Sequence, residues 1–303
     1  ANQPTIPIAF ASDDRYVPML TTTIYSMLRN ASSSYHYAIA ILEKNISNHN
    51  KQCMIEFFSR FENATIRFVN VAGSINKFNL NTNNEHISVE TYYRFFIQEI
   101  FSFYDKALYL DSDLIVEGDI AHLYETELGG NLVAAVRDID FLGNLNMKDN
   151  HRLDYNDKIL HMQNPYNYFQ AGVLLLNTSA MRNLHSIDKW LEIASNPAYI
   201  YNDQDVLNVH CEGRTVYIED SWNVMTDCFN RVTNVFSFAP AKEFDNYLEA
   251  RKHPKIIHYA GFEKPWNTRN CDLCEFYWKY ARNTPFYEAL LSARTGLAPV
   301  EDN

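Results

Sequence analysis

The feature that most restricts the fold is the regular alternation of short apolar runs with amphipathic segments. Four apolar runs are predicted to be strands, at residues 6–11, 35–42, 64–71 and 107–110. The first segment between them places its apolar residues at helical spacing: Val17, Leu20, Ile24 and Met27. Strands that alternate with helices predict an α/β fold with a mainly parallel sheet and right-handed crossovers.

Two serines are placed where helices should begin. Ser47 is expected to cap a helix that buries Met54, Ile55, Phe58 and Phe61. Ser186 is expected to cap another, which buries Ile187, Trp190, Leu191 and Ala194. An Asn-rich loop is predicted at residues 73–86, followed by a helix at 90–101 that buries Phe95, Phe96 and Ile100.

The second half of the chain is less regular. Strands are predicted at residues 132–136, 173–176 and 256–257. A polar, turn-rich stretch occupies residues 143–168. Because long loops inside a compact domain often cover a functional site, this stretch is predicted to be such a cover.

Bulk properties exclude several classes of protein. The chain of 303 residues is long enough for one large domain or two modest ones, and its net charge of −11 argues against a nucleic-acid partner. It contains no run of about 18 apolar residues. Five irregularly spaced cysteines predict reduced thiols and a cytoplasmic protein. Cys271 and Cys274 have half of a zinc-type spacing, but no second pair follows, which favours a packed pair.

Two carboxylates lie where the fourth predicted strand ends. Asp111 and Asp113 follow the apolar run 107–110 directly, and Asp13 follows the first predicted strand. In a parallel sheet ligands bind at the carboxyl ends of the strands, so these acids should lie at one edge. Carboxylates suit Mn²⁺ and Mg²⁺. No glycine-rich phosphate loop is present, so a metal would have to neutralise the phosphates of any bound nucleotide.

These pieces occur in the order found in one enzyme family. They are Phe-Ala-Ser-Asp-Asp-Arg-Tyr at 10–16, Thr-Tyr-Tyr-Arg at 91–94, Leu-Tyr-Leu-Asp-Ser-Asp at 108–113, Tyr-Phe-Gln-Ala-Gly-Val-Leu-Leu-Leu-Asn at 168–177, Asp-Gln-Asp-Val-Leu-Asn at 203–208 and the segment 258–266. The chain resembles the bacterial members of glycosyltransferase family 8, particularly the lipooligosaccharide galactosyltransferase type, and more distantly glycogenin.

The resemblance implies a GT-A fold with a Rossmann-like central sheet. Residues 1–115 would form the half that binds the nucleotide sugar, and residues 116–303 the half that binds the acceptor, together with a C-terminal segment. The implied activity is transfer of galactose or glucose from a UDP-sugar, with Mn²⁺, or alternatively Mg²⁺, and retention at the anomeric carbon. The implied acceptor is a glycan, such as a lipooligosaccharide or a lipid-linked oligosaccharide.

The resemblance also assigns the donor site. Asp111, Asp113 and His258 match the metal ligands of the family. Lys264 and Gly261 match the diphosphate-binding positions, and Ser112 lies between the two metal acids. Asp13 and Tyr16 match the positions that hold uracil, although Asp13 could instead cap the following helix. Arg94 matches an arginine near the donor, with a structural ion pair to the acids as the alternative reading.

Four further positions match the donor-sugar pocket: Asp138, Gln170, Asp203 and Gln204. Gln170 stands where the galactosyltransferase type commonly has Asn, so the hexose is left open between galactose and glucose. The catalytic candidates are Gln204, Asp203 and Asp138. Because the position beneath the sugar offers an amide, a front-face mechanism is favoured over double displacement.

Two other functions also fit parts of this sequence pattern. A phosphatase of the haloacid dehalogenase type also ends a strand in Asp-x-Asp, and a non-catalytic nucleotide-sugar or carbohydrate-binding protein could keep the same fold. The segment 276–282 is aromatic and carries Lys279 and Arg282. It suggests peripheral contact with the inner face of the cell membrane.

Overall fold

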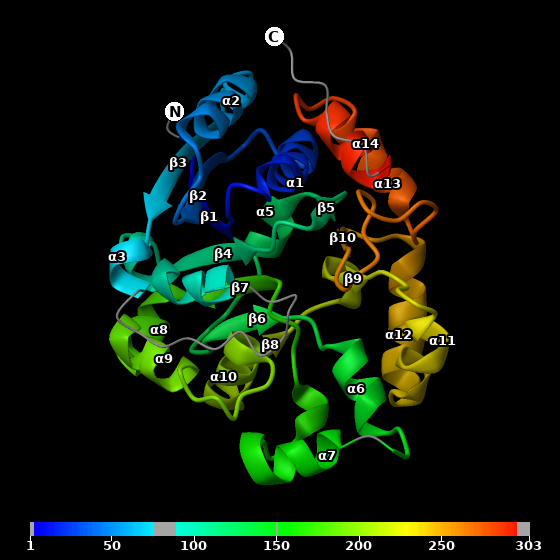
Figure 1. The fold of residues 1–303 in the computed structure, drawn as a ribbon. Coiled ribbons are helices and arrows are strands. Elements are labelled where there is room, and N and C mark those ends of the chain that lie inside the picture. The colour runs from blue at the N-terminus through cyan, green and yellow to red at the C-terminus, as the bar shows by residue number, and fades with distance from the viewer. Residues whose placement is uncertain (1–2, 76–88, 150, 296–303) are drawn as a thin grey trace.

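The computed structural model describes residues 3–75, 89–149 and 151–295. Its centre is a sheet of seven strands in the order β3-β2-β1-β4-β7-β6-β8 (Figure 1). Their bounds are β1 Thr5–Ala11, β2 His36–Glu43, β3 Ala64–Asn70, β4 Lys106–Leu110, β6 Val133–Ala135, β7 Val173–Asn177 and β8 Thr215–Tyr217. The predicted α/β class with a mainly parallel sheet is confirmed.

One strand of this sheet runs against the others. β7 pairs antiparallel with both β4 and β6, whereas β3, β2, β1 and β4 are parallel neighbours and β6 is parallel to β8. The start of β7 therefore lies at the same edge of the sheet as the ends of β1, β4 and β6. This reversal brings residues 170–172 beside Asp111, which follows β4.

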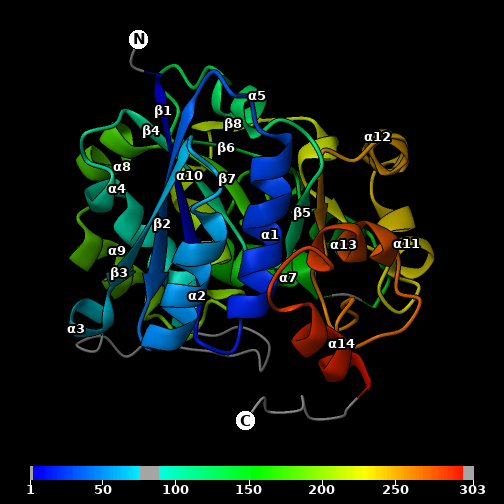
Figure 2. The same cartoon turned by 90° about the horizontal axis from the view of Figure 1, so that it is seen from above.

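Side chains alternate between the two faces of the central strands, as the pleat requires. Ile6, Ile8 and Phe10 of β1 pack on one face with α1, α2, α13 and α14, while Ala9 and Ala11 pack on the other with α8, α9 and α10. Figures 1 and 2 show these two groups of helices on opposite sides of the sheet. The sheet is thus buried on both faces, as expected for a sheet built from parallel strands.

The helices vary widely in length. The longer ones are α1 Val17–Asn30, α2 Asn48–Phe58, α8 Thr178–Leu184, α9 Ile187–Ala194, α10 Asn202–Cys211, α12 Ala241–Lys252, α13 Cys274–Ala281 and α14 Tyr287–Thr295. The shorter ones are α3 Ala72–Ile75, α4 Ile97–Ile100, α5 Ile120–Tyr124, α6 Ile139–Leu145, α7 Arg152–Tyr155 and α11 Arg231–Asn234. Short 3₁₀ helices occupy Val89–Phe96, Pro165–Asn167, Asp220–Trp222 and Phe236–Phe238, and a π-helical turn occupies Asn156–Leu160.

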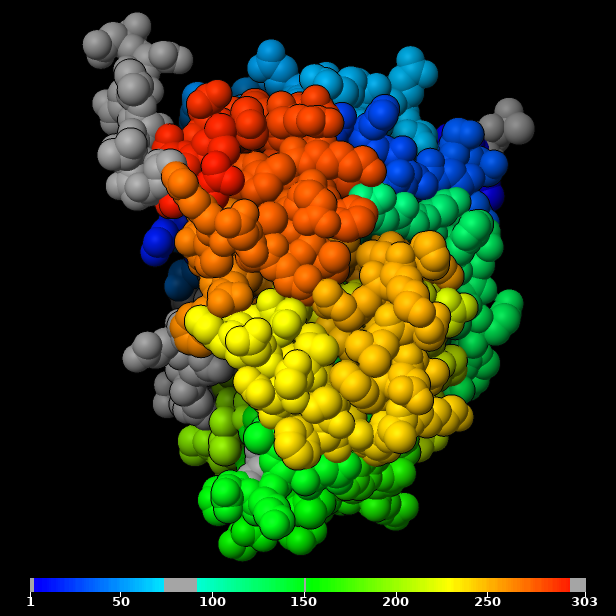
Figure 3. Space-filling model, turned by 90° about the vertical axis from the view of Figure 1, so that its right-hand side faces the viewer, coloured from blue at the N-terminus to red at the C-terminus, as the bar shows by residue number. Residues whose placement is uncertain are grey.

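A second, smaller sheet positions the histidine of the predicted site. It contains β5 Leu114–Val116, β9 Val224–Met225 and β10 Ile256–His258, in the order β5-β10-β9. The antiparallel register places His258 opposite Leu114, the residue after Asp113. Outside this sheet, α11 and α12, in yellow and gold, lie below α13 and α14, in orange to red, on the surface shown in Figure 3.

Both predicted caps are present. The Ser47 side chain accepts a hydrogen bond from Asn50 N at the start of α2, and the Ser186 side chain accepts one from Lys189 N at the start of α9. The burial predicted for α2 is wrong at two residues. Ile55 is 45% exposed, with Phe57 buried instead, and Phe61 lies beyond the end of the helix and is only partly buried. Ile55 lies on the exposed side of α2, whose buried residues Met54, Phe57 and Phe58 pack in the core with β1, β2 and α1.

Two predictions about irregular segments need correction. Residues 143–168 are not a single loop, because α7, the π-helical turn and a 3₁₀ helix pack a small core of Phe141, Leu145, Tyr155, Leu160, Met162 and Tyr168. The helix predicted at 90–101 is a 3₁₀ helix that continues into α4. Most of the Asn-rich segment 73–86 lies outside the described residues.

None of the helices in the described part of the chain is long and apolar enough to cross a membrane. All five cysteines are free thiols. Among the described residues, Cys271 and Cys274 do not belong to any group of three side chains placed to bind a metal.

Candidate metal and donor site

The two acids of Leu-Asp-Ser-Asp occupy the connection between β4 and β5. The Asp111 backbone N–H donates to Gly172 O at 2.8 Å, which fixes Asp111 against the residue before β7. The Tyr109 hydroxyl donates to Asp111 Oδ1, also at 2.8 Å. Both side-chain carboxylates are partly buried, at 26% and 15% exposed, so they point into a protected space rather than into bulk water.

His258 completes a group of three potential metal ligands. Its Nε2 lies 3.1 Å from Asp113 Oδ1 and 3.4 Å from Asp111 Oδ2, and the side chain is buried. One ligand atom from each of the three residues lies within 4.8 Å of the other two. The pairing of β10 with β5 thus brings His258 next to Asp113, although the two residues are 145 positions apart in the sequence.

The charges in this group influence one another strongly. Burial alone would lower the pKa of His258, but the Asp113 and Asp111 carboxylates outweigh burial and raise it to about 9. Burial would raise the pKa of Asp113, but the Lys264 ammonium and His258 outweigh that effect and hold it well below its usual range. Asp113 is therefore ionised, with the Lys264 ammonium 2.8 Å from its Oδ2.

The residues present fit a divalent cation. Two carboxylates and an imidazole are hard or borderline donors that suit Mn²⁺ or Mg²⁺. Asp113 Oδ1 is buried and accepts no hydrogen bond from the described residues, although it lies close to His258. Gly172 leaves the space that a side chain would fill, since a Cβ there would lie 2.5 Å from Asp111 Oδ2 and 2.5 Å from His258 Cε1.

Lys264 and Gly261 lie on the loop that follows β10. Lys264 Nζ is 2.8 Å from Asp113 Oδ2 and donates to Tyr259 O at 2.7 Å, so the ammonium is held at the edge of the acid group. Gly261 has φ = +100°, a conformation that favours glycine. A Cβ there would lie 3.2 Å from Cys228 Sγ, so the loop is also closely packed.

Arg94 connects the metal acids to the start of α10. Its Nε lies 2.6 Å from Asp203 Oδ2, its Nη2 lies 3.6 Å from Asp111 Oδ1, and its Nη1 donates to Ala171 O. The guanidinium also lies over the Tyr109 ring, 4.4 Å from its centroid. An ion pair is therefore present with one of the two candidate metal acids, Asp111, and a shorter one with Asp203.

Asp138 and Gln204 meet at the other side of the site. Asp138 Oδ1 accepts from Phe141 N at the start of α6, and Asp138 Oδ2 accepts from Gln204 Nε2 at 3.2 Å. Gln204 Oε1 accepts from Ala171 N at 2.9 Å. Burial and the nearby charge of Asp140 raise the pKa of Asp138 to about 6. Asp138 is thus held by a helix N-terminus and an amide.

Gln170 is turned toward the three candidate metal ligands. Its Oε1 accepts from Gly172 N at 2.6 Å and from Asn223 Nδ2 at 2.7 Å. Asn223 Oδ1 in turn lies 2.9 Å from Nδ1 of His258. Asn223, Tyr109 and Gly172 are contacts of the candidate site that the sequence motifs did not predict. Gly172 belongs to a matching motif, but Asn223 lies in an irregular stretch without any local signal.

The predicted uracil-binding residues lie at the end of β1. Asp13 Oδ1 accepts from Tyr16 N at 2.9 Å, but the helix begins at Val17 without a side-chain cap, so the reading of Asp13 as the N-cap is wrong. The Tyr16 ring is half-buried and packs edge-to-face on Trp266, with 5.9 Å between centroids. The Ser112 hydroxyl donates to Ala11 O at 2.7 Å, which ties the ends of β4 and β1 together.

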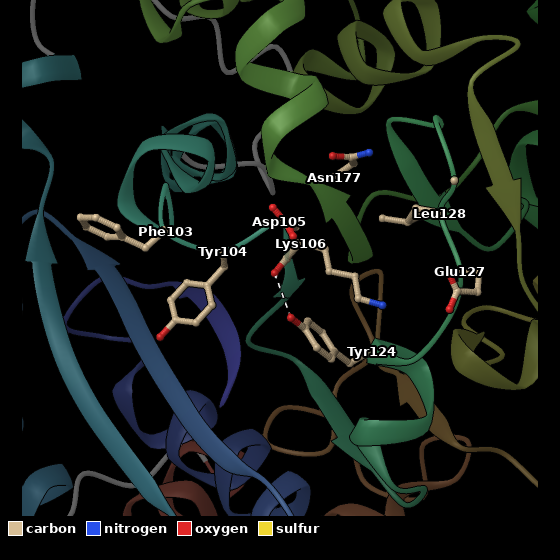
Figure 4. A pocket seen from close by; sticks show the side chains of 9 residues that line it. Phe103, Tyr104, Asp105, Lys106, Tyr124, Glu127, Leu128 and Asn177 are labelled. Atoms are coloured by element: carbon tan, nitrogen blue, oxygen red, sulfur yellow. Dashed lines mark hydrogen bonds between the residues drawn. The ribbon is translucent and has the colours of Figure 1, made fainter. Parts of the chain in front are cut away.

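A surface cavity of about 420 Å³ lies at the opposite end of β4 (Figure 4). It is lined by Lys106, Tyr124 and Asn177 among others, and the Tyr124 hydroxyl donates to Lys106 O at 3.3 Å. Because a strand rises about 3.3 Å per residue, the five residues of β4 separate this cavity from Asp111 by roughly 16 Å. The cavity is therefore distinct from the candidate site.

Comparison with known proteins gives one family. The sequence model described as "Glycosyl transferase family 8" matches residues 7–270. The chain is 28% identical to the glycosyltransferase GlyF of Streptococcus pneumoniae serotype 4 over 282 residues, which are 90% of this chain and 60% of GlyF. It is 29% identical to the lipopolysaccharide 1,2-glucosyltransferase of Escherichia coli K12 over 180 residues, which are 58% of this chain and 48% of that protein.

Solved structures agree with this result. The bifunctional glycosyltransferase WbbM superposes with a TM-score of 0.86 and 31% identity, over 96% of this chain and 52% of that one. The galactosyltransferase LgtC, solved with donor and acceptor sugar analogs, superposes with a TM-score of 0.74 and 27% identity, over 92% of this chain and 96% of LgtC. The predicted GT-A fold is confirmed by these neighbours. The chain spans little more than half the length of GlyF and WbbM.

Proposed function

The chain belongs to glycosyltransferase family 8, and from this we propose that it transfers galactose or glucose from a UDP-sugar to a glycan acceptor, with retention at the anomeric carbon. The single observation that supports this most directly is the group of Asp111, Asp113 and His258 with Lys264 beside it. Such a group suits a metal and a diphosphate together. The family membership does not favour the phosphatase alternative or the non-catalytic alternative.

We assign the metal-binding role to Asp111, Asp113 and His258, with Mn²⁺ as the preferred ion and Mg²⁺ as the substitute. A bound divalent cation supplies positive charge that offsets the charge gathering on the departing UDP. Lys264 Nζ is held close enough to Asp113 to exchange that carboxylate for a phosphate oxygen when the donor binds. The ammonium would then stabilise the leaving group, because its contact strengthens as negative charge develops.

The other contacts with the UDP-sugar are assigned to residues that lie near the candidate metal ligands. Asp13 and Tyr16, at the end of β1, are proposed to hold uracil, and Ser112 and Gly261 to approach the ribose and diphosphate through backbone groups. Asp138, Asp203 and Gln204 are proposed to face the hexose. Residues 1–115 then carry most of the nucleotide contacts, and residues 116–303 carry the hexose and acceptor contacts.

Retention is proposed to proceed on the front face. The nearest carboxylate candidates for a nucleophile are engaged, since Asp203 pairs with the buried Arg94 and Asp138 binds the N-terminus of α6. Gln204 offers an amide, which is a weak nucleophile. In the front-face route the acceptor hydroxyl attacks the anomeric carbon as the bond to UDP breaks, and the hydroxyl proton passes to the leaving diphosphate. The new glycosidic bond forms on the face that UDP leaves.

We propose a lipooligosaccharide or lipid-linked oligosaccharide as acceptor, because lipopolysaccharide and galactosyl transfer appear among the similar proteins. We also propose a cytoplasmic enzyme at the inner face of the cell membrane. In the segment 276–282, Tyr277 and Tyr280 are buried in the core, so the exposed basic residues Lys279 and Arg282 are proposed to contact that membrane.

The proposed function is tested with a panel of nucleotide sugars. We expect Mn²⁺-dependent consumption of UDP-galactose or UDP-glucose, loss of activity with a chelator and recovery when Mn²⁺ is added back. The anomeric configuration of the product, read by NMR, should match that of the donor. Activity that is indifferent to chelator would contradict the metal assignment, and a covalent sugar on Asp203, detected by mass spectrometry, would contradict the front-face route.

A further inference from the structure

Two side-chain amides, those of Asn223 and Gln170, connect His258 to the backbone N–H of Gly172, the residue before β7. His258 Nδ1 lies 2.9 Å from Asn223 Oδ1, Asn223 Nδ2 lies 2.7 Å from Gln170 Oε1, and Gln170 Oε1 accepts from Gly172 N at 2.6 Å. His258 and Asn223 are 1% and 5% exposed, so water competes little for these contacts. The three side chains come from β10, the residue before β9 and the residues before β7.

The donor and acceptor of each hydrogen bond between His258 and Gly172 can be assigned by starting from the backbone N–H of Gly172. A backbone N–H can only donate, so the Gln170 atom that faces Gly172 N is the amide oxygen. That oxygen can only accept, so the Asn223 atom beside it is the amide nitrogen. The other Asn223 atom is then its oxygen, which accepts from His258. His258 must therefore carry its proton on Nδ1.

The consequence concerns the other ring nitrogen. With Nδ1 protonated, the neutral imidazole presents a lone pair on Nε2, and Nε2 is the atom that lies against Asp113 and Asp111. We infer that Asn223 and Gln170 are positioning residues that hold His258 in this tautomer and ring orientation, so that Nε2 is available to a divalent cation. Metal ligands of this kind commonly depend on such partners. The inference rests on the metal assignment of the proposed function and gives Gln170 a role in addition to any contact with the sugar.

The test measures Mn²⁺ binding in the absence of donor, by the EPR signal of the free ion, so that no turnover is involved. The Asn223→Leu variant keeps the volume and removes both hydrogen bonds, and we expect Mn²⁺ affinity to fall about 10- to 100-fold. The Asn223→Asp variant keeps the acceptor for Nδ1–H, but its second carboxylate oxygen would face Gln170 Oε1, so it is combined with Gln170→Leu. We expect this double variant to bind Mn²⁺ at least about threefold more tightly than Asn223→Leu. Recovery of Mn²⁺ affinity in this double variant would show that the hydrogen bond to His258, and not the packing of the side chain, is what metal binding requires.

Two further variants keep the test decisive. Gln170→Leu leaves the Asn223 amide without its anchor, and we expect an intermediate loss that is not additive with Asn223→Leu, because both act through His258. Asn156→Leu is the matched control. Asn156 is a buried asparagine that bonds both backbone groups of Met162, away from the metal group. It should lose thermal stability but keep the Mn²⁺ affinity of the parent.

The outcomes distinguish this inference from the proposed function. A parent chain that binds no Mn²⁺ would contradict the metal assignment itself. A parent that binds Mn²⁺ together with folded Asn223→Leu and Gln170→Leu variants of unchanged affinity would overturn the positioning role alone. Equal losses in Asn223→Leu and Asn156→Leu would also overturn it, because general loosening of the fold would then account for the effect.

Discussion

Gly172 shows how one missing side chain shapes the site. A Cβ at this residue would lie 2.5 Å from Asp111 Oδ2 and from His258 Cε1, and 2.7 Å from Gln170 Oε1. These are ends of side chains, so they can move aside, and the main cost should fall on the ligand geometry. We expect Gly172→Ala to weaken Mn²⁺ binding at least tenfold, with a loss of unfolding free energy of about 1–3 kcal/mol.

The matched control is Gly130→Ala, because nothing lies within 4 Å of a Cβ there and the backbone is not left-handed. Gly130→Ala should change the unfolding free energy by about 0.5 kcal/mol at most and leave Mn²⁺ affinity unchanged. Metal titration and thermal unfolding of both variants provide the comparison. Equal Mn²⁺ affinity in Gly172→Ala and the parent would show that the site tolerates a methyl group.

For single residues, the sequence motifs predicted the candidate metal ligands but not the side chain that hydrogen-bonds to His258. Asp111 and Asp113 follow an apolar strand and His258 belongs to a recognisable segment, so all three could be named from the sequence. Asn223 could not be named, because its contact with His258 depends on the pairing of β9 with β10, which no local pattern indicates. A hydrogen bond between residues far apart in the sequence does not produce a repeating pattern of apolar and polar residues, so the sequence pattern cannot predict it.

At the scale of elements, a buried carboxylate ties α10 to the segment that was predicted to be a loop. Asp205 of α10 accepts hydrogen bonds from the hydroxyls of Tyr155 and Tyr168 and from Tyr201 N. Burial raises the pKa of Asp205 from 3.8 to about 6, despite the opposing effect of the two tyrosines. The folded state thus binds the Asp205 proton more tightly than the unfolded state does.

This pKa shift predicts how stability changes with pH. The contribution of Asp205 is fully present below pH 3.8 and is lost as pH rises through 6, and two pKa units correspond to about 3 kcal/mol. We expect Asp205→Asn to lack this component. In urea unfolding, the free energy of the variant relative to the parent should therefore rise between pH 4.5 and pH 7. A constant difference across that range would show that Asp205 does not titrate with the shifted value.

The same region shows which elements the sequence could not indicate. The strands of the first half and the helices α1, α2 and α9 were recognisable because each repeats its apolar spacing over two turns or more, or over a continuous buried run. Between residues 143 and 168, α7 changes after Tyr155 into a π-helical turn, and the 3₁₀ helix Pro165–Asn167 has a third geometry. Pieces whose geometry changes in this way do not keep a period of 3.6 residues, and they are stabilised by the core around Phe141 and Tyr168 rather than by propensity.

At the scale of the whole molecule, β4 separates two environments that each contain a lysine. Lys264 lies at the carboxyl end of β4, paired with Asp113. Lys106 lies at the amino end, beside the cavity of Figure 4, where its Nζ donates to Thr126 O at 3.2 Å and lies 4.7 Å from the Tyr124 ring centroid. The carboxyl end gathers the predicted site residues, as expected for a sheet of this type.

Because the two lysines lie at opposite ends of β4, Lys106 can serve as the control for Lys264. We expect Lys264→Met to lower the rate of sugar transfer about 10²- to 10³-fold, because the leaving diphosphate loses a positive group that acts most strongly in the transition state. Lys106→Met removes the same charge at the other end of β4, roughly 16 Å from Asp111, and should change kcat/KM less than about twofold. Steady-state kinetics on both variants, with thermal unfolding to verify the fold, make the comparison. A large loss of kcat/KM in folded Lys106→Met would indicate that the reaction takes place near the cavity of Figure 4. A transfer rate equal to that of the parent in Lys264→Met would show that Lys264 does not stabilise the leaving group.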